Sequence, residues 1–220
     1  MLTRRQVLSG VSLLAACAVL GVPRVSFAQW ADTVPASDLA VPSPLGDMTL
    51  GKDDAPVTVI EYASMTCPHC AHFATTTFPA FRQKYIDTGK VRYIFREFPL
   101  DNVALGAAVV ARSADKSKFF PIIELLFSTQ AQWITQTPVE SMAAVLKQAG
   151  ISADQVKSWL DLQKNEASRT IVAGIKATQD FATDKLGVKS TPTFFINGKR
   201  VPGALSLDEM DRELSRYLKV

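Results

Sequence analysis

The sequence has few cysteines, few histidines and no large excess of one charge. Three cysteines and two histidines occur in 220 residues, which excludes a fold held together by several disulfides. Lysine and arginine total 24 and aspartate and glutamate 21, so the charge balance does not indicate nucleic acid or an anionic membrane as the partner. Hydrophobic residues make up 47% of the chain. The sequence can therefore bury a sizeable core, as one large domain or one domain with an insertion.

Residues 1–28 have the pattern of a cleaved export signal. Two arginines precede an apolar run (7–21), and the small residues Ser26 and Ala28 suit a cleavage site. The apolar run is too short, and too interrupted by serine and glycine, to indicate a transmembrane helix. We therefore expect Gln29 to be the first residue of the mature chain.

Two more specific interpretations of this signal stay open. Residues 3–8 resemble a twin-arginine export motif. Residues 14–17 resemble a lipoprotein box with Cys17 as the lipidated residue, although the apolar run continues past it. Removal of residues 1–28 takes away three arginines and Cys17, leaving 21 basic residues, 21 acidic residues and two cysteines. An exported chain that keeps one close cysteine pair is predicted to use it for chemistry.

That pair, Cys67 and Cys70, lies where a strand pattern changes to a helix pattern. The run 57–62 is apolar and β-branched, as in a buried parallel strand, and Pro68 suits the first turn of a helix. Cys67 is therefore predicted at a helix N-terminus, where unpaired N–H groups and the helix dipole stabilise a thiolate. Since the thiolate is the reactive form of cysteine, the pattern indicates a redox-active pair.

Other interpretations of the pair fit less well. A structural disulfide across four residues would add little, because stabilisation grows with loop length. A zinc site would need Cys67, His69, Cys70 and His72, all within six residues, to converge on one tetrahedral ion. Covalent haem attachment needs a histidine after the second cysteine, where this chain has Ala71.

The remaining patterns predict an α/β fold with a mixed four- to five-stranded sheet, interrupted by an all-helical insertion. This prediction rests on the strand patterns and on a helix after the cysteines that is kinked at Pro79. It also rests on capping sequences at 137–140, 152–155 and 206–209. Asn197-Gly198 is a type I′ hairpin signal. The expected strands are 48–51, 57–62, 90–98, 193–196 and 199–201. The expected divisions are the signal 1–28, a flexible arm 29–47, the sheet domain in two parts, 48–100 and 169–220, and the helical insertion 101–168.

Two motifs make the chain resemble the DsbA-like thiol–disulfide oxidoreductases, which have a thioredoxin fold with an inserted helical domain. The first is residues 61–70, which end in Cys-Pro-His-Cys where thioredoxins usually have Cys-Gly-Pro-Cys. The second is residues 190–198, Ser-Thr-Pro-Thr-Phe-Phe-Ile-Asn-Gly. The likeness covers nearly all of residues 48–220.

The resemblance assigns a role to each candidate site residue. Cys67 would attack and Cys70 would resolve, with Pro68 and His69 between them and Glu61 buried beneath the pair. Pro192 would be cis and pack beside the cysteines, and Thr191 would offer its backbone to a substrate strand. The candidate catalytic residues are thus Cys67, Pro68, His69, Cys70 and Glu61, and the candidate substrate-binding residues are Thr191 and Pro192.

Two of these roles have alternatives. His69 could lower the pKa of Cys67 or be a solvent-facing spacer. Glu61 could accept the proton of Cys70, or it could pair with a cation on the next strand, namely Lys90, Arg92 or Arg96. The two functions of Glu61 are compatible.

The resemblance implies a periplasmic thiol oxidase that introduces disulfides into newly exported proteins. It further implies a monomer without cofactor or metal, reoxidised by a quinone-linked, DsbB-like membrane partner. The alternatives are an isomerase or reductase of the same fold, a non-catalytic peptide-binding chaperone, or a metal-handling protein. An isomerase would usually carry a dimerisation region, for which residues 29–47 are too short.

Overall fold

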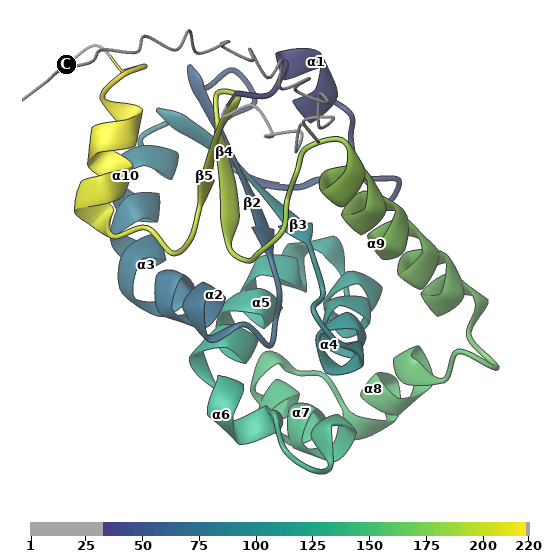
Figure 1. Cartoon of the computed structure of the whole chain (residues 1–220). Coiled ribbons are helices and arrows are strands. Elements are labelled where there is room, and N and C mark those ends of the chain that lie inside the picture. The colour runs from purple at the N-terminus through teal and green to yellow at the C-terminus, as the bar shows by residue number, and fades with distance from the viewer. Residues whose placement is uncertain (1–32, 219–220) are drawn as a thin grey trace, which may run out of the picture.

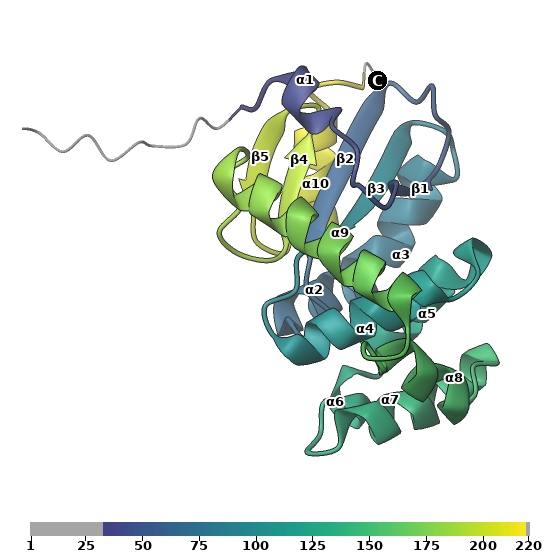
Figure 2. The same ribbon diagram turned by 90° about the vertical axis from the view of Figure 1, so that its right-hand side faces the viewer.

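A five-stranded sheet forms the centre of the molecule, and helices cover both of its faces (Figures 1 and 2). The computed structural model describes residues 33–218. The predicted export signal and Cys17 lie outside these residues. Helices α4 to α8 gather at one end of the sheet, and the longer α9 runs across one of its faces (Figure 2).

The sheet is mixed, with strand order β1-β3-β2-β4-β5. Strands β2 and β3 are parallel, whereas β1 and the β4–β5 hairpin run antiparallel to their neighbours. The predicted mixed sheet is therefore confirmed. Asn197 and Gly198 have φ values of 44° and 96°, as a type I′ turn requires. The strands are β1 (Met48–Leu50), β2 (Val57–Ala63), β3 (Val91–Glu97), β4 (Thr193–Ile196) and β5 (Lys199–Pro202).

The helix after the cysteines is continuous from residue 68 to residue 86, but it contains two π-helical segments. One of them, η1, lies directly before the turn that holds Pro79. A wider turn there avoids the clash between the proline ring and the carbonyl four residues earlier. The segments of this helix are α2 (Pro68–His72), η1 (Phe73–Thr77), α3 (Phe78–Phe81) and η2 (Arg82–Ile86).

The remaining helices of the described residues include the predicted helical block and a short helix, α1, that was not predicted. They are α1 (Ala36–Leu39), α4 (Asn102–Ser113), η3 (Lys116–Lys118), α5 (Phe119–Ser128), α6 (Gln130–Trp133), α7 (Pro138–Leu146), η4 (Lys147–Ala149), α8 (Ala153–Leu160), α9 (Glu166–Asp184) and α10 (Leu207–Leu214). Since α9 begins at residue 166, the predicted boundary between 168 and 169 falls inside its first turn. None of the helices in residues 33–218 is long and apolar enough to cross a membrane.

Two of the three predicted caps form. Ser152 and Ser206 each make a full capping box, at the starts of α8 and α10. The predicted cap of α7 is wrong: the helix begins at Pro138, but the side chain of Thr137 makes no capping bond. The Thr137 N–H instead donates to the hydroxyl of Thr135.

Alternate residues of the central strands enter two separate cores. One core lies between the sheet and α2, α3, α5 and α10, and it contains Val59, Phe95 and Phe194. The other lies between the sheet and the elements α9 and α1, and it contains Ile60 and Phe195. In β2 and β3, odd-numbered residues therefore face the cysteine-bearing helix, and even-numbered residues face α9.

Residues 33–47 lie against the sheet, although the sequence predicts a loose arm there. Val34 and Leu39 join the core on the α9 side. Arg96, only 2% exposed, donates to both carboxylate oxygens of Asp47 at 2.9 Å and to the carbonyl of Val41 at 3.0 Å. A buried arginine on β3 thus fixes a segment whose composition alone favours disorder.

Candidate active site

The two cysteines lie at the start of α2, directly after β2. Cys67 is the N-cap residue of α2, with an extended backbone (φ −76°, ψ 121°), and Pro68 occupies the first turn. Both cysteines are thiols. Cys67 is 5% exposed and Cys70 is fully buried, one turn further into the helix. Both cysteines are therefore buried, but Cys67 lies nearer the surface than Cys70.

The two thiols have opposite acidities. The pKa of Cys67 is lowered to about 5, first because the Cys70 thiol donates a hydrogen bond to it. Burial opposes this effect, while hydrogen bonds from the backbone N–H groups of Cys70 and His69 add to it. The pKa of Cys70 is raised, first by burial, then by its bond to Cys67 and by the charge of Glu61. At neutral pH the pair therefore consists of one thiolate and one thiol.

Thr191 and Pro192 lie beside Cys67 although 124 positions separate Thr191 from it. The Sγ atom of Cys67 is 3.3 Å from the carbonyl oxygen of Thr191, to which the thiol form donates. The peptide bond between Thr191 and Pro192 is cis. The hydroxyl of Thr191 is buried and has no hydrogen-bond partner within residues 33–218.

Side chains from the helical block hold the loop between β2 and α2. The amide of Gln130 donates to the carbonyls of Met65 and Cys67, at 2.9 and 3.1 Å. The hydroxyl of Thr66 donates to Asp101 at 2.7 Å, and Asp101 also caps α4. Nothing in the sequence singles out Gln130, because no local pattern marks a bond across 63 residues.

Glu61 lies in β2 on the face that meets α2, and it is 2% exposed. Its carboxyl accepts a hydrogen bond of 2.5 Å from the hydroxyl of Tyr93 on β3. Burial raises the pKa of Glu61 to about 8; the bond from Tyr93 lowers it and the charge of Cys67 raises it further. The carboxyl can thus gain or lose a proton near neutral pH.

The alternative of an ion pair between Glu61 and Lys90, Arg92 or Arg96 is not realised; none of the three cations contributes to the pKa of Glu61. Arg92 forms an ion pair with Asp53, and Arg96 with Asp47. Both arginines have the parity of the opposite face of the sheet, so neither reaches Glu61. Tyr93 takes the place of the expected cation.

Pro68, His69 and His72 lie on the exposed side of α2. The imidazole of His69 makes no hydrogen bond or ion pair with any residue from 33 to 218, and its backbone N–H contributes to the acidity of Cys67. Within this same range, no group of three or more histidine, cysteine, aspartate or glutamate residues is arranged to hold a metal ion.

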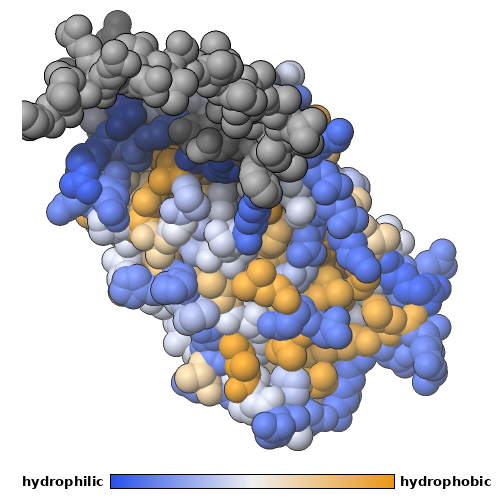
Figure 3. Space-filling model, in the orientation of Figure 1, coloured by the Kyte–Doolittle hydropathy of each residue, from blue (hydrophilic) through white to orange (hydrophobic). Residues whose placement is uncertain are grey.

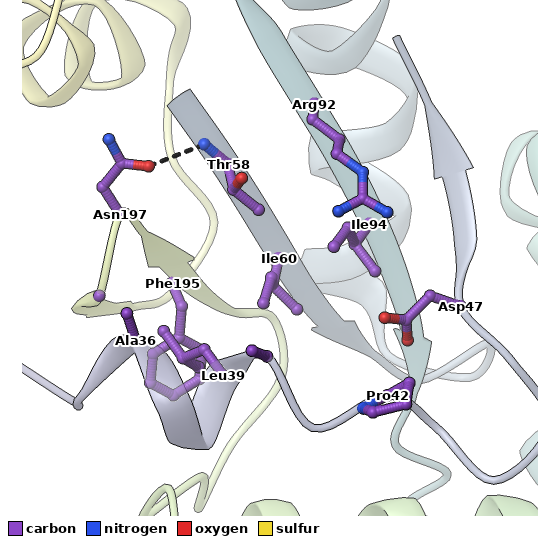
Figure 4. Close-up of a pocket in the computed structure, with 12 residues that line it drawn as sticks. Ala36, Leu39, Pro42, Asp47, Thr58, Ile60, Arg92, Ile94, Phe195 and Asn197 are labelled. Carbon is purple, nitrogen blue, oxygen red and sulfur yellow. Dashed lines mark hydrogen bonds between the residues drawn. The ribbon is translucent and has the colours of Figure 1, made fainter. Parts of the chain in front are cut away.

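A pocket of about 450 Å³ lies on the other face of the sheet, away from the cysteines (Figure 4). Its lining includes Ile60, Ile94 and Phe195, with the guanidinium of Arg92 and the carboxylate of Asp47 at its margin. None of the predicted site residues lines it. The cysteines therefore lie at the end of β2 and not in this pocket.

The fold and the paired cysteines are those of the class of thiol–disulfide oxidoreductases. A family model described as thioredoxin matches residues 43–216. The chain therefore belongs to the thioredoxin family, and within it to the DsbA-like proteins.

Relatives and solved structures agree with this assignment. The chain is 30% identical to the probable disulfide bond formation protein D of Bacillus cereus, over 78% of each chain. It is 34% identical to a putative protein-disulfide oxidoreductase of Rickettsia typhi, over 79% of this chain, and spans 62% of that relative's length. The crystal structure of alpha-DsbA1 from Wolbachia pipientis matches with a TM-score of 0.72 and 29% identity, covering 83% of this chain and 96% of that one. Oxidised BdbD from Bacillus subtilis matches with a TM-score of 0.65 and 26% identity, covering 81% and 96%.

Proposed function

We propose that this protein is a periplasmic thiol oxidase that transfers the Cys67–Cys70 disulfide to newly exported proteins. The observation that carries the proposal is the difference between the two thiols in pKa, which is lowered at Cys67 and raised at Cys70. A thiolate at Cys67 is a good leaving group, and stabilising it favours the reduced pair and so makes the disulfide a stronger oxidant. The names of the relatives, which refer to disulfide oxidoreduction and disulfide bond formation, support the same chemistry.

The reaction would begin when a substrate thiolate attacks the sulfur of Cys67. A substrate–Cys67 disulfide forms, the Cys67–Cys70 bond breaks, and Cys70 leaves with the electron pair. Because its pKa is raised, Cys70 needs a proton, and the protonated carboxyl of Glu61 would supply it. A second substrate thiolate then attacks the substrate sulfur of the mixed disulfide and releases Cys67 as a thiolate. Two electrons have then passed from the substrate to the cysteine pair.

The reverse step uses the same groups. When the Cys70 thiol attacks a mixed disulfide on Cys67, the carboxylate of Glu61 would accept the proton. A carboxyl with a pKa of about 8 can act in both directions near neutral pH. Reoxidation of the pair would then fall to a quinone-linked, DsbB-like membrane partner, and we expect the protein to act as a monomer without a bound cofactor.

We expect the substrate to be an unfolded chain that presents its cysteine in an extended segment. The carbonyl of Thr191 lies beside Cys67, which supports the proposal that the backbone of Thr191 bonds with such a segment. Figure 3 shows hydrophobic residues gathered over the helical block and the adjoining end of the sheet. Leu100, which follows β3, is 54% exposed. Apolar surface of this kind favours unfolded clients, which expose their own apolar side chains.

His69 would add to the acidity of Cys67 through its imidazole as well as through its backbone N–H. His69→Ala keeps the backbone N–H and removes the ring. The midpoint of the thiolate absorbance titration should then rise above the value of about 5. An unchanged midpoint would mean that His69 lowers the pKa of Cys67 through its backbone N–H alone.

Three assays together test the proposal. The protein with its Cys67–Cys70 disulfide should rapidly oxidise reduced ribonuclease, and it should be slow in unscrambling ribonuclease and in reducing insulin. Cys70→Ser should accumulate mixed disulfides with client proteins, whereas Cys67→Ser should trap none. Rapid isomerase activity with slow oxidation would favour the isomerase alternative, and full oxidase activity in Cys67→Ser would overturn the assignment of the attacking cysteine.

A further inference from the structure

Glu61 has one side-chain hydrogen-bond partner among the described residues, the phenol of Tyr93. The hydroxyl oxygen lies 2.5 Å from Oε2 of Glu61, and the two residues are 3% and 2% exposed. In the parallel register, Tyr93 is opposite Val59 and Glu61 is opposite Phe95. Both side chains therefore face α2, as diagonal neighbours on one face of the sheet.

We propose that Tyr93 is a positioning residue for proton transfer at Cys70, acting through Glu61. The inference rests on the proposed role of Glu61 and adds a residue that the motifs do not include. The phenol donates to the carboxylate and so stabilises its charge at a site where burial disfavours charge. Tyr93 need not touch the reacting sulfurs. It sets how readily Glu61 gives up and takes up a proton.

Among the groups around Glu61, Tyr93 is the one that stabilises the charged carboxylate. Burial and the charge of Cys67 both raise the pKa of Glu61, and the hydrogen bond from Tyr93 opposes them. From β4, the residue opposite Glu61 is the apolar Phe194. No cation of β3 takes part, since both of its arginines belong to the other face.

The groups that act on Tyr93 keep it a donor. The pKa of Tyr93 is raised well above its usual value, first by burial and then by Glu61, Cys70 and Glu124 of α5. From β1, the residue opposite Tyr93 is Leu50. Because its pKa is raised, the phenol stays protonated and donates throughout the pH range in which Glu61 titrates.

Tyr93 also packs in an aromatic cluster, so a variant must separate its hydroxyl from its ring. The ring lies 4.9 Å from that of Phe78, measured between centroids. Tyr93→Phe keeps this packing and removes the donor. Tyr85→Phe is a matched control: the Tyr85 ring contacts Phe81 in the same cluster, but its hydroxyl donates to Asp211 at 2.7 Å, outside the active site.

The test measures how fast Cys70 resolves a mixed disulfide on Cys67, as a function of pH. The reduced protein is mixed with an aromatic disulfide whose released thiolate is coloured. A first release reports attack by Cys67, and a second reports resolution by Cys70. In the unmodified protein the second rate should rise with pH to a midpoint near 8, the pKa of Glu61. Glu61→Gln should lose this rise.

Tyr93→Phe should shift the midpoint upward by about one unit or more, because a hydrogen bond to a charged group has been removed. At pH 7 the second release should then be about tenfold slower, with the first release little changed. Tyr85→Phe should match the unmodified profile. Adding Tyr93→Phe to Glu61→Gln should cause no further shift, because the hydroxyl acts only through the carboxylate.

The outcomes separate the inference from the function on which it rests. A Tyr93→Phe profile equal to that of the unmodified protein, with Glu61→Gln still defective, would overturn the role of Tyr93 alone. A Glu61→Gln profile equal to that of the unmodified protein would overturn the role of Glu61, and that of Tyr93 with it. If Tyr93→Phe does not fold, a ring-fluorinated tyrosine at position 93 replaces it. Its more acidic phenol is a stronger donor and should lower the midpoint, and an unchanged midpoint would again overturn the inference.

Discussion

Acidification should shift the balance of stability between the reduced and the disulfide forms of this protein. The pKa of Cys67 is lowered to about 5 in the folded state, against about 8.5 for an unfolded cysteine. A lowered folded-state pKa stabilises the folded protein fully above the unfolded pKa, and the contribution is lost as the pH falls through the folded pKa. Between pH 7 and pH 4 the loss is about 2.7 kcal/mol, at about 1.36 kcal/mol per unit. Solvent screening at a site open to substrate reduces this to about 2 kcal/mol.

The disulfide contributes an opposing term that does not depend on pH. Closing the short loop from Cys67 to Cys70 stabilises the oxidised form by about 2 kcal/mol through the entropy of the unfolded chain. At pH 7 the thiolate offsets this advantage, and the two forms should have similar stability. At pH 4 the thiolate is protonated, and the oxidised form should be more stable by about 2 kcal/mol. The change with pH is therefore a sharper test than the order of the two forms at pH 7.

Urea unfolding of both forms at pH 7 and at pH 4 measures this change. The difference in unfolding free energy between them should move by about 2 kcal/mol, which corresponds to about 45 mV in reduction potential. The single-cysteine variants supply the control. Cys70→Ser keeps the Cys67 thiolate and a donor beside it, so it should show the pH dependence, whereas Cys67→Ser should not. A difference between the forms that stays constant from pH 7 to pH 4 would refute the thiolate argument, and with it the main support for a strong oxidant.

Two further predictions concern contacts that hold the active-site end and the N-terminal segment. Gln130→Ala removes two hydrogen bonds to the loop around Cys67, so it should cost about 1–3 kcal/mol of unfolding free energy and speed amide exchange in residues 64–70. Gln132→Ala, at an exposed position of the same helix, should change neither the stability nor the exchange. Arg96→Met leaves the carboxylate of Asp47 without its buried partner and should cost about 3–5 kcal/mol by urea unfolding. Arg92→Met breaks a pair with the exposed Asp53 and should cost at most about 1 kcal/mol, so equal losses in the two variants would contradict the burial argument.

Local patterns predict the elements around the cysteines because each of them is specified within a few residues. The apolar run of β2 and the proline after Cys67 define a strand-to-helix turn. The capping boxes at Ser152 and Ser206 and the hairpin at Asn197 depend on equally short segments. In each of these cases the residues that form the bonds are neighbours in the sequence, and the prediction agrees with the structure.

Contacts between distant segments could not be predicted in the same way. Arg96 and Asp47 are 49 positions apart, and the composition of residues 29–47 gives no sign that a buried arginine holds them. Gln130 reaches Cys67 across 63 positions. The approach of Thr191 to Cys67 was expected only from the resemblance to a known family. Such pairs depend on how the sheet and the helical block are placed, which no short window of sequence records.

The partner of Glu61 could be predicted in part from the sequence. The alternation of side chains along a strand excludes Arg92 and Arg96 as partners, although it does not identify Tyr93. Side chains of a strand alternate between the two faces of the sheet, so only residues of one parity on β3 can meet Glu61. Arg92 and Arg96 share the parity that faces α9, whereas Tyr93 shares that of the face toward α2. The apolar character of both strands hides this alternation in the sequence, since the sheet is buried on both sides. A phenol in place of a cation also changes the chemistry. It can donate to the carboxylate without adding a positive charge that would hold Glu61 ionised, and this leaves the carboxyl free to titrate beside Cys70.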